Sequence, residues 1–473
     1  MLNEAAASAR TSGTSRRALY GMLLAMAIIE ALSGITQGYL NPILPALGPV
    51  FSIDDPTING IFLISGVSFA VVTPIISRLG DSYGYRLVLR WSTAIVAAGV
   101  LIMAIWPSLL TVTVGVVMLT FVVGFIPLMM GILRTTSPAE TRRGVAVMIG
   151  VLMLTVGGGG LLAGIVGATD PLLGLWVAVP FAVAALISSF LLPDAGVPTR
   201  ERIAVVPLIA CSLGLIGFVV ALSMGPEWGW VDVRTLLSGL AGLSLLVWWF
   251  TQDSRKNILS KQRFMDLRLL SNPRVRVVSI ATYFFGFASI SYFGVNGIFL
   301  HADPLRTGYG FSSGALTIAI VMFAGCVLAF LSSLLTARVM TMLGEKATLV
   351  IAGALLAGGF IVMIFAHASF TGYCIGFALF NLSLGMYQAG TRALSVEGVP
   401  VEETSTAAGL NELALSVGAA VGAAVVKLIA SSNVVAGSIT GGGIIAIWAA
   451  LAAAAALAAL ASARYNKARA GQA

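Results

Sequence analysis

Long apolar runs, each about as long as a lipid bilayer is thick, dominate this sequence. A run of roughly 20 such residues can cross the hydrocarbon core as a helix. Each run is continuously apolar and lacks the alternation of period two that barrel strands show, so helices are predicted. Charged residues form only 10% of the chain, against about 25% in soluble proteins. We therefore predict an all-α integral membrane protein with fourteen transmembrane helices, near residues 19–41, 57–79, 88–106, 109–131, 145–166, 171–192, 203–224, 234–251, 275–300, 312–336, 346–367, 370–392, 406–430 and 438–463.

The basic residues lie in alternate links between these runs. Most of them precede the first run or follow an even-numbered run, and Arg392 ends the twelfth. The opposite links carry three bases and six acids: Arg234, Arg306, Lys427, Asp54, Asp55, Asp170, Glu227, Asp232 and Asp303. Cytoplasmic loops are enriched in Lys and Arg, so both termini are predicted to be cytoplasmic in a multi-pass cell (inner or plasma) membrane protein. This topology accounts for the net charge of +8, and no nucleic-acid partner is expected.

A weak internal repeat divides the chain. When Gly84 is aligned with Gly344, Arg86 falls on Lys346 and Asp81 falls on Thr341, each after the second helix of a six-helix set. Secondary transporters are built from such repeated halves, with the site between them. The predicted parts are a cytoplasmic N-terminus (1–18), a six-helix bundle (19–192), an inserted helix pair (193–251), a cytoplasmic linker (252–274), a second six-helix bundle (275–463) and a cytoplasmic tail (464–473).

The segment "GDSYGYR" between the second and third runs resembles the acidic–Gly–basic loop of the major facilitator superfamily. "GPEWGW" and "AAGLNELALSVGAAVG" are similar to its fourteen-helix drug:proton antiporter branch, and the resemblance covers roughly residues 18–463. It implies two six-helix bundles plus two inserted helices. Physically, Gly84 allows a tight turn, and Asp81 with the basic Arg86 can form a charge-assisted gate at the cytoplasmic ends of the helices.

The fifth run contains "TVGGGGLLAG", and its glycines would let another helix approach closely. The candidate packing residues are Gly157, Gly158, Gly159, Gly160 and Gly164. The antiporter motif of the resembled branch also has a proline here, which this chain lacks. The branch's proton-relay positions in the fourth and first helices align with Thr120, Val123 and Thr36, none of which titrates. The glycines thus mark either an antiport element or a packing seam alone.

Two carboxylates lie inside predicted spans and are the candidates for proton coupling. Glu30 is near the middle of the first span, and Glu412 lies about two turns into the thirteenth. A charge in the hydrocarbon core costs about 2.5–3.5 kcal/mol on insertion scales, so such residues are functional candidates by default. The alternative for each is a structural role, in which a protonated or hydrogen-bonded acid joins helices. No Lys or Arg is expected to face a buried substrate.

Polar side chains in otherwise apolar spans could line a central cavity. The candidates are Thr36, Gln37, Asn41, Asn296, Asn381 and Gln388. Hydrogen bonding between helices is an equally good account of each residue alone.

These features predict a secondary active transporter that exports lipophilic or cationic small molecules, such as drugs or antibiotics, as protons enter. A symporter or facilitator for a metabolite is the alternative. No enzymatic activity, metal or cofactor is expected, because His301 and His367 are isolated and no phosphate-binding loop occurs. The partners are a small-molecule substrate, protons and the lipid bilayer, and we expect the chain to act as a monomer.

Overall fold

Each of the fourteen predicted spans falls on a helix in the computed structural model of the protein. The structure describes residues 16–52, 55–193, 204–254, 267–397, 399–400, 403–435 and 438–465. Residues 1–15, the middle of the predicted linker (255–266) and the tail from 466 lie outside the described residues. Thirteen of the described helices, some of them joined segments, are long and apolar enough to cross a membrane. The remaining predicted span falls on α3 (Asp55–Tyr83), a helix of 29 residues.

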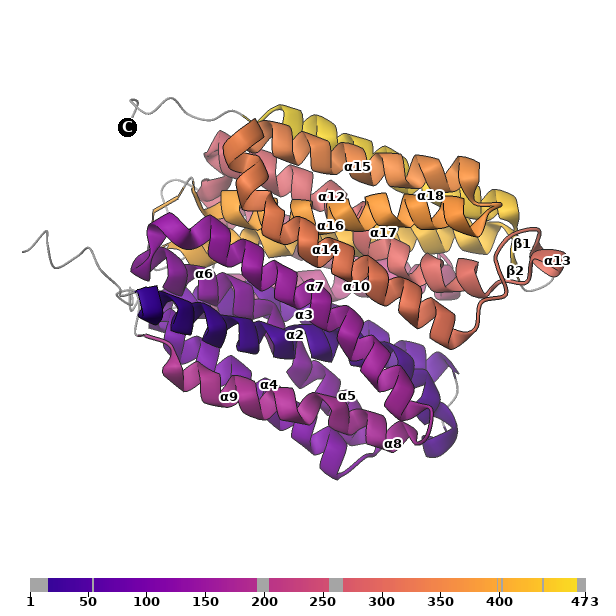
Figure 1. The fold of residues 1–473 in the computed structure, drawn as a ribbon, viewed down its shortest axis with the longest axis horizontal. Coiled ribbons are helices and arrows are strands. Elements are labelled where there is room, and N and C mark those ends of the chain that lie inside the picture. Colours follow the sequence, from indigo (N-terminus) through magenta and orange to yellow (C-terminus); the bar gives the residue numbers. More distant parts are fainter. Residues whose placement is uncertain are drawn as a thin grey trace, which may run out of the picture.

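The chain forms two helical halves that lie side by side (Figure 1). The N-terminal half contains α2 (Arg16–Phe51), α3, α4 (Tyr85–Ile105), α5 (Leu109–Leu119), η1 (Thr120–Gly124), α6 (Phe125–Thr136), η2 (Pro138–Glu140), α7 (Thr141–Gly167), α8 (Pro171–Gly174), η3 (Leu175–Ala178) and α9 (Val179–Leu191). The C-terminal half contains η5 (Leu267–Ser271), α12 (Pro273–His301), α13 (Pro304–Thr307), α14 (Ala315–Leu343), α15 (Glu345–Ala366), α16 (Phe370–Glu397), α17 (Thr404–Ser432), β1 (Val434–Val435), β2 (Ser438–Ile439) and α18 (Gly441–Ala463). The strands β1 and β2 form a short antiparallel hairpin.

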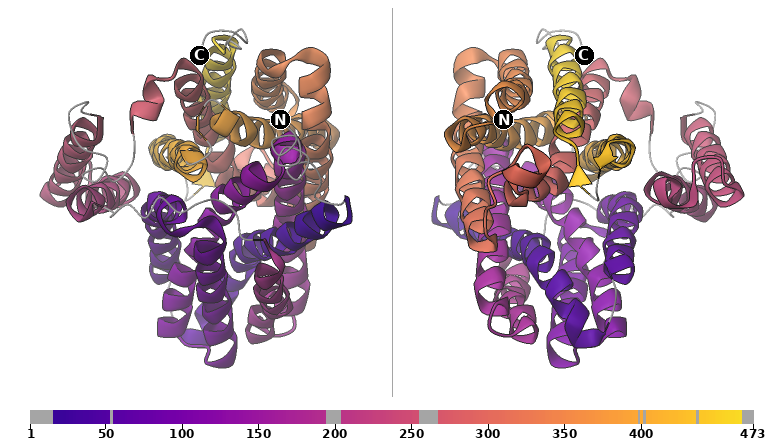
Figure 2. Two further views of the ribbon diagram at one scale, coloured as in Figure 1. Left: turned by 90° about the vertical axis from the view of Figure 1, so that its left-hand side faces the viewer. Right: turned by 90° about the vertical axis from the view of Figure 1, so that its right-hand side faces the viewer.

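The inserted pair, α10 (Val205–Trp228) and α11 (Val233–Ser254), stands at the side of the bundle (Figure 2). Its helix α10 packs against α3 of one half and α17 of the other. The described ends of the chain, where α2 begins and α18 ends, lie on one side of the molecule, here called the termini face (Figure 1).

Two glycines give the repeat a structural signature. Gly84 and Gly344 precede α4 and α15 and have φ angles of 99° and 86°. L-residues with a side chain rarely adopt such angles, so glycine is required at both sharp turns. The two halves therefore turn in the same way at the aligned positions.

Prolines account for the interruptions in two spans. Pro127 and Pro180 lie in the first turn of α6 and α9, directly after the short 3₁₀ segments η1 and η3. Proline has no N–H, so the carbonyl four residues earlier loses its helical partner, and the preceding turn tightens. The first span also differs from its prediction, because α2 continues through Pro42 and Pro45 to Phe51.

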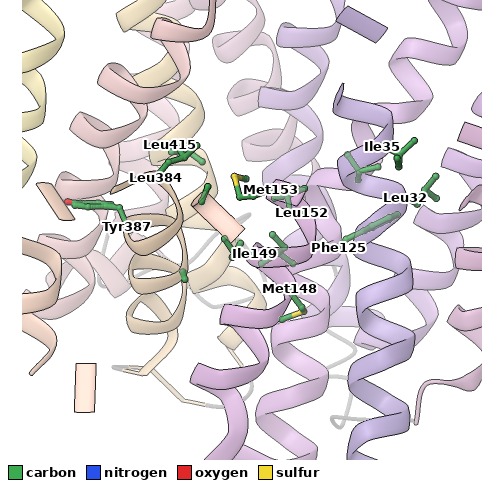
Figure 3. Packing of buried hydrophobic residues seen from close by; sticks show 14 of the residues in the cluster. Leu32, Ile35, Phe125, Met148, Ile149, Leu152, Met153, Leu384, Tyr387 and Leu415 are labelled. Atoms are coloured by element: carbon green, nitrogen blue, oxygen red, sulfur yellow. The ribbon is translucent and has the colours of Figure 1, made fainter. Parts of the chain in front are cut away.

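The halves meet along α7, which packs against α2 on one side and α14 on the other. Leu152 and Met153 of α7 lie between Leu384 and Leu415 of the C-terminal half and Ile35 of α2 (Figure 3). These five side chains are buried. The outer surface is apolar, as a lipid-facing surface must be, with large side chains such as Phe365 and Leu110 mostly exposed.

Candidate functional site

Glu30 lies on α2 and is completely buried. Ser33, Arg392 and Glu412 lie close enough to act on its charge. Within the part of the chain that the structure describes, neither carboxylate oxygen of Glu30 has a hydrogen bond of normal geometry. An ionised carboxylate without a partner costs far more free energy in such a place than a protonated one. The protonation of Glu30 therefore depends on whether a charged or polar group approaches its carboxylate.

A buried ion pair faces Glu30 from the C-terminal half. Arg392 of α16 contacts Glu412 of α17, with its Nε 2.6 Å from Oε1 and its Nη2 2.9 Å from Oε2. Both side chains are less than a tenth exposed. Arg392 also donates a hydrogen bond to the side-chain oxygen of Gln388, one turn earlier on α16. The guanidinium thus donates one hydrogen bond to Glu412 through Nη2, lies at ion-pair distance from the other carboxylate oxygen through Nε, and donates to a neutral amide through Nη1.

The burial of Arg392 corrects two predictions. Its position at the end of a run predicted a cation at the cytoplasmic boundary, and no buried base was expected. In the structure α16 continues to Glu397, so Arg392 lies more than one turn inside the helix and is 6% exposed. The spacing of Gln388 and Arg392, four residues apart, together with an acid inside the thirteenth run, was the available signal. Gln388, predicted to line a cavity, instead accepts this hydrogen bond.

Glu30, Arg392 and Glu412 form a cluster, here called the buried triad, with one acid in the N-terminal half and an acid–base pair in the other. The arrangement brings both predicted coupling acids together around a base that they can share. Arg392 is always charged, so any change in the protonation of Glu30 changes the force between the halves.

The predicted gate residues have different surroundings. Asp81 accepts hydrogen bonds from the backbone N–H of Thr406, at 2.8 Å, and from its hydroxyl, which joins α3 to α17 across the two halves. Gly84 makes the turn that follows. Arg86, predicted as the basic partner in this gate, donates from its Nη2 to the carbonyl of Phe190, 3.0 Å away, at the end of α9 within the N-terminal half. The hydroxyl and amide of Thr406 provide the link between the halves.

Asp81 lies at the end of α3, beyond the predicted span of residues 57–79. Burial raises the pKa of Asp81 to about 7, against the lowering effects of the hydrogen bonds from Thr406 and Tyr85 and the charge of Arg78. When the termini face opens and water reaches Asp81, an ordinary pKa of about 3.9 returns. Closing therefore takes up a proton between about pH 4 and pH 7, and the closed contact weakens as the pH rises through about 7.

We therefore expect the termini face to open more at about pH 8 than at about pH 6. Spin labels on Ala139→Cys and Met342→Cys, in a Cys374→Ser background, would report this as a longer distance between the halves. Asp81→Asn stays neutral at both pH values and should show no shift. An equal pH response in this variant would show that another group is responsible.

Further contacts close the termini face, and the sequence did not identify them. Arg142 of α7 pairs with Glu397 of α16, with Nε 2.5 Å from Oε1, and also with Glu345 of α15. Arg134 donates to the carbonyl of Val399, at 2.5 Å, and to the hydroxyl of Thr404, at 3.0 Å. These bonds all join the N-terminal half to the C-terminal half.

Tyr465, just after α18, borders this network. Burial, and then the charges of Glu345 and Glu397, raise its pKa, so the phenol stays neutral. A neutral phenol can donate to Glu345, which is already shared with Arg142.

The polar residues predicted to line a cavity divide between two surroundings. Thr36 and Gln37 line a cavity of about 200 Å³ between α2, α3 and the α5–η1 segment. Both side chains also bond within α2, Thr36 to the carbonyl of Leu32 and Gln37 to the hydroxyl of Ser33. The volume is below the range of about 300–1,000 Å³ that drug-sized ligands occupy. The side chain of Asn41 lies outside the described residues.

The other two amides belong to the interior of the C-terminal half. Asn296 accepts a hydrogen bond from Tyr373, whose hydroxyl lies 2.7 Å from that of Tyr292. Asn381 donates to the carbonyl of Phe377 on the turn before it. Both amides are buried among aromatic rings. In this conformation their groups are used in packing within one half.

The glycines of α7 face two different helices. A Cβ on Gly157 would lie 2.7 Å from Cys326 of α14, and one on Gly159 would lie 2.9 Å from the carbonyl of Ile35 on α2. Gly160 faces Gly38 of α2, at an ordinary 3.4 Å, and Gly158 meets only Phe323 of α14, at 3.9 Å. Among the described residues, nothing lies within 4 Å of a Cβ on Gly164.

This contrast supplies a test of close helix packing. A Cβ on Gly38 would lie 2.0 Å from the carbonyl oxygen of Val156, so Gly38→Ala must push α2 and α7 apart. We expect a loss of about 1–3 kcal/mol of stability, measured as a lower melting temperature in detergent. Gly164→Ala is the matched control, since it adds the same methyl to open space and removes a flexible residue from a helix. Equal melting temperatures for the two variants would show that the seam is not tightly packed.

Among the described residues, no group of three or more His, Cys, Asp or Glu side chains is placed to hold a metal ion. The described residues thus form two helical halves with a buried triad between them, and side-chain contacts join the halves at the termini face.

The family model "Major Facilitator Superfamily" matches residues 26–423. The chain belongs to this superfamily. Family members are transporters, and the protein is accordingly a multi-pass plasma-membrane transporter of a small molecule.

Curated relatives of this superfamily member are similar at low identity. A probable actinorhodin transporter of Streptomyces coelicolor is 27% identical over 87% of this chain and 72% of its own length. The lincomycin resistance protein LmrB of Listeria monocytogenes is 25% identical over 67% of this chain and 66% of its own length. The tetracenomycin C resistance and export protein of Streptomyces glaucescens is 23% identical over 80% of this chain and 68% of its own length.

Solved structures of the superfamily share the fold. The human organic anion transporter MFSD10 (TETRAN) superposes with a TM-score of 0.67 at 16% identity, over 94% of this chain and 99% of that one. The proton:xylose symporter XylE superposes with a TM-score of 0.63 at 12% identity, over 94% of this chain and 95% of that one.

Proposed function

We propose that this transporter exports lipophilic or cationic small molecules, of the antibiotic or drug class, in exchange for protons, and that the termini face is cytoplasmic. The relatives named for antibiotic transport and resistance support the substrate class. The excess of Lys and Arg at the links on the termini face supports the orientation. The fourteen-helix drug:proton antiporter branch fits the inserted pair α10 and α11.

The buried triad is the observation that carries proton coupling. When Glu30 is ionised, it attracts Arg392 across the interface and competes with Glu412 for it. When Glu30 is protonated, this attraction is lost, and Arg392 remains fully with Glu412. A proton on Glu30 thus changes the free energy of bringing the halves together near the triad. An alternating transporter requires such a ligand, one whose binding free energy differs between its two conformations.

Asp81 with Thr406, and Arg142 with Glu345 and Glu397, would act as the cytoplasmic gate. Each contact joins the halves and must break when that face opens. The glycines of α7 let α2 of the same half and α14 of the other half lie close against it.

An organic anion carrier, as a symporter or facilitator, is the second candidate. The observation that favours it is Arg392 itself, a buried cation that could bind a carboxylate or phosphate of a substrate. In the present conformation Glu412 occupies that guanidinium, which favours a role in coupling.

Uptake by inverted membrane vesicles would distinguish the two. With an interior-acid pH gradient, we expect vesicles that contain the protein to accumulate a lipophilic cationic dye, and to lose it when the gradient is collapsed. Vesicles without the protein are the control. Accumulation of an organic anion that Arg392→Leu abolishes, with no movement of the dye, would favour the second candidate and overturn the first.

A further inference from the structure

A groove unrelated to the buried triad opens at the termini face between the inserted pair and the C-terminal half. It has a volume of about 720 Å³ and lies between the end of α11, η5 and the first turns of α12. This volume is within the range of ligand-binding sites. The groove is therefore large enough for a bound molecule, and none of its lining residues belongs to the buried triad.

The lining of the groove changes from charged to apolar along α12. Arg276, Ser279, Ile280, Tyr283 and Phe284 all line it, and their spacing of three and four residues places them on one face of the helix. Arg276 lies in the first turn, and Phe284 lies about 12 Å deeper. An occupant must therefore be charged at the termini face and apolar toward the interior of the membrane.

The other walls repeat this polarity. Arg268 and Ser271 of η5, and Ser254 at the end of α11, line the outer part, whereas Phe250 lies one turn deeper on α11. Phe250 and Ile280 leave nearly half of their surface uncovered. The charged residues that line the groove are two arginines, with no acid among the lining residues described. Asp253, next to Ser254, is instead buried and accepts a hydrogen bond from Trp249.

From this geometry we propose that the groove binds one anionic phospholipid of the leaflet at the termini face. Its phosphate contacts Arg268 and Arg276, and an acyl chain lies along Ile280, Tyr283 and Phe284. A guanidinium has five N–H donors, so each arginine can bind a phosphate oxygen while also contacting the protein. The lipid fills the space between α11 and α12 and ties the inserted pair to the C-terminal half. This inference does not depend on what the protein transports.

Native mass spectrometry of the full chain, taken from mixed phosphatidylglycerol and phosphatidylcholine, tests the proposal. We expect one phosphatidylglycerol to remain bound to the wild type, in clear preference to phosphatidylcholine. The double variant Arg268→Gln/Arg276→Gln should bind it about thirty-fold more weakly, from about fivefold for each basic residue near an anionic lipid. Arg338→Gln/Lys346→Gln is the matched control, because it removes two exposed charges from the termini face outside the groove.

A third variant tests the apolar part and remains informative if the arginine variant does not fold. Ser279→Trp keeps both arginines and places a bulky ring in the groove, so it should also lose the bound lipid. Equal retention of the two lipids by the wild type would overturn the proposal. Retention of phosphatidylglycerol by Ser279→Trp would also overturn it. So would a loss of phosphatidylglycerol from the control variant as large as the loss from the arginine variant. A synthetic peptide of residues 255–266 tests the other occupant. If this peptide displaces phosphatidylglycerol and phosphatidylcholine equally, that segment of the chain is the occupant of the groove and the proposal is wrong.

Discussion

Replacing Arg392 by leucine is expected to lower the stability of the protein by about 3–5 kcal/mol, because Glu412 is left ionised and unpaired in a buried site. The melting temperature of the purified protein would report the loss. Arg392→Lys keeps the charge but cannot hold both oxygens of Glu412 at once, so its loss should be smaller. Leucine and lysine are close to each other in volume, which limits the contribution of packing to the difference between the two variants.

The double variant Arg392→Leu/Glu412→Leu separates stability from function. Removing both members of a buried ion pair is often neutral or stabilising, since neither charge then has to leave water. We expect the double variant to melt near the wild type, yet to transport nothing against a gradient, because Glu30 has lost the base to which it responds. If the double variant transports normally, the ion pair only joins α16 to α17, and the buried triad has no part in coupling.

The helices could be predicted from the sequence, because a membrane requires long apolar runs and marks their ends with basic residues. The turns at Gly84 and Gly344 could also be predicted, since a positive φ needs glycine whatever surrounds it. These features depend on the solvent and on the local backbone. They do not depend on which helices become neighbours.

The contacts between the two halves could not be predicted, because they depend on which helices become neighbours. Asp81 and Thr406 are 325 residues apart in the sequence, whereas the sequence predicts only the nearby Arg86 as a partner of Asp81. The carbonyl of Phe190, which accepts from Arg86, is likewise more than 100 residues away. The sequence predicts Arg392 as a boundary charge, because its burial depends on Glu412 of another helix. The cost of a charge in a bilayer singles out Glu30 and Glu412 from the sequence, but the base between them is visible only in three dimensions.

Glu30→Gln should abolish the coupling of transport to the pH gradient, and this is the most direct test of the proposed function. If one neutral molecule is exchanged for one proton, a gradient of one pH unit supports about tenfold accumulation. Glutamine keeps the size and polarity of Glu30 but cannot gain or lose a proton. The variant should therefore exchange labelled for unlabelled substrate across the membrane but accumulate none in response to the gradient.

Glu140→Gln is the control, since it removes a carboxylate at the termini face that contacts only the neighbouring Arg143 among the ion pairs described. It should accumulate substrate as the wild type does. If Glu30→Gln also accumulates substrate normally, Glu30 is a structural acid and Glu412→Gln becomes the variant to measure. Loss of accumulation in Glu30→Gln with exchange preserved would place the transported proton on Glu30, the acid of the buried triad that accepts no hydrogen bond of normal geometry from the described residues. A proton can bind and leave there without first breaking the ion pair of Arg392 with Glu412.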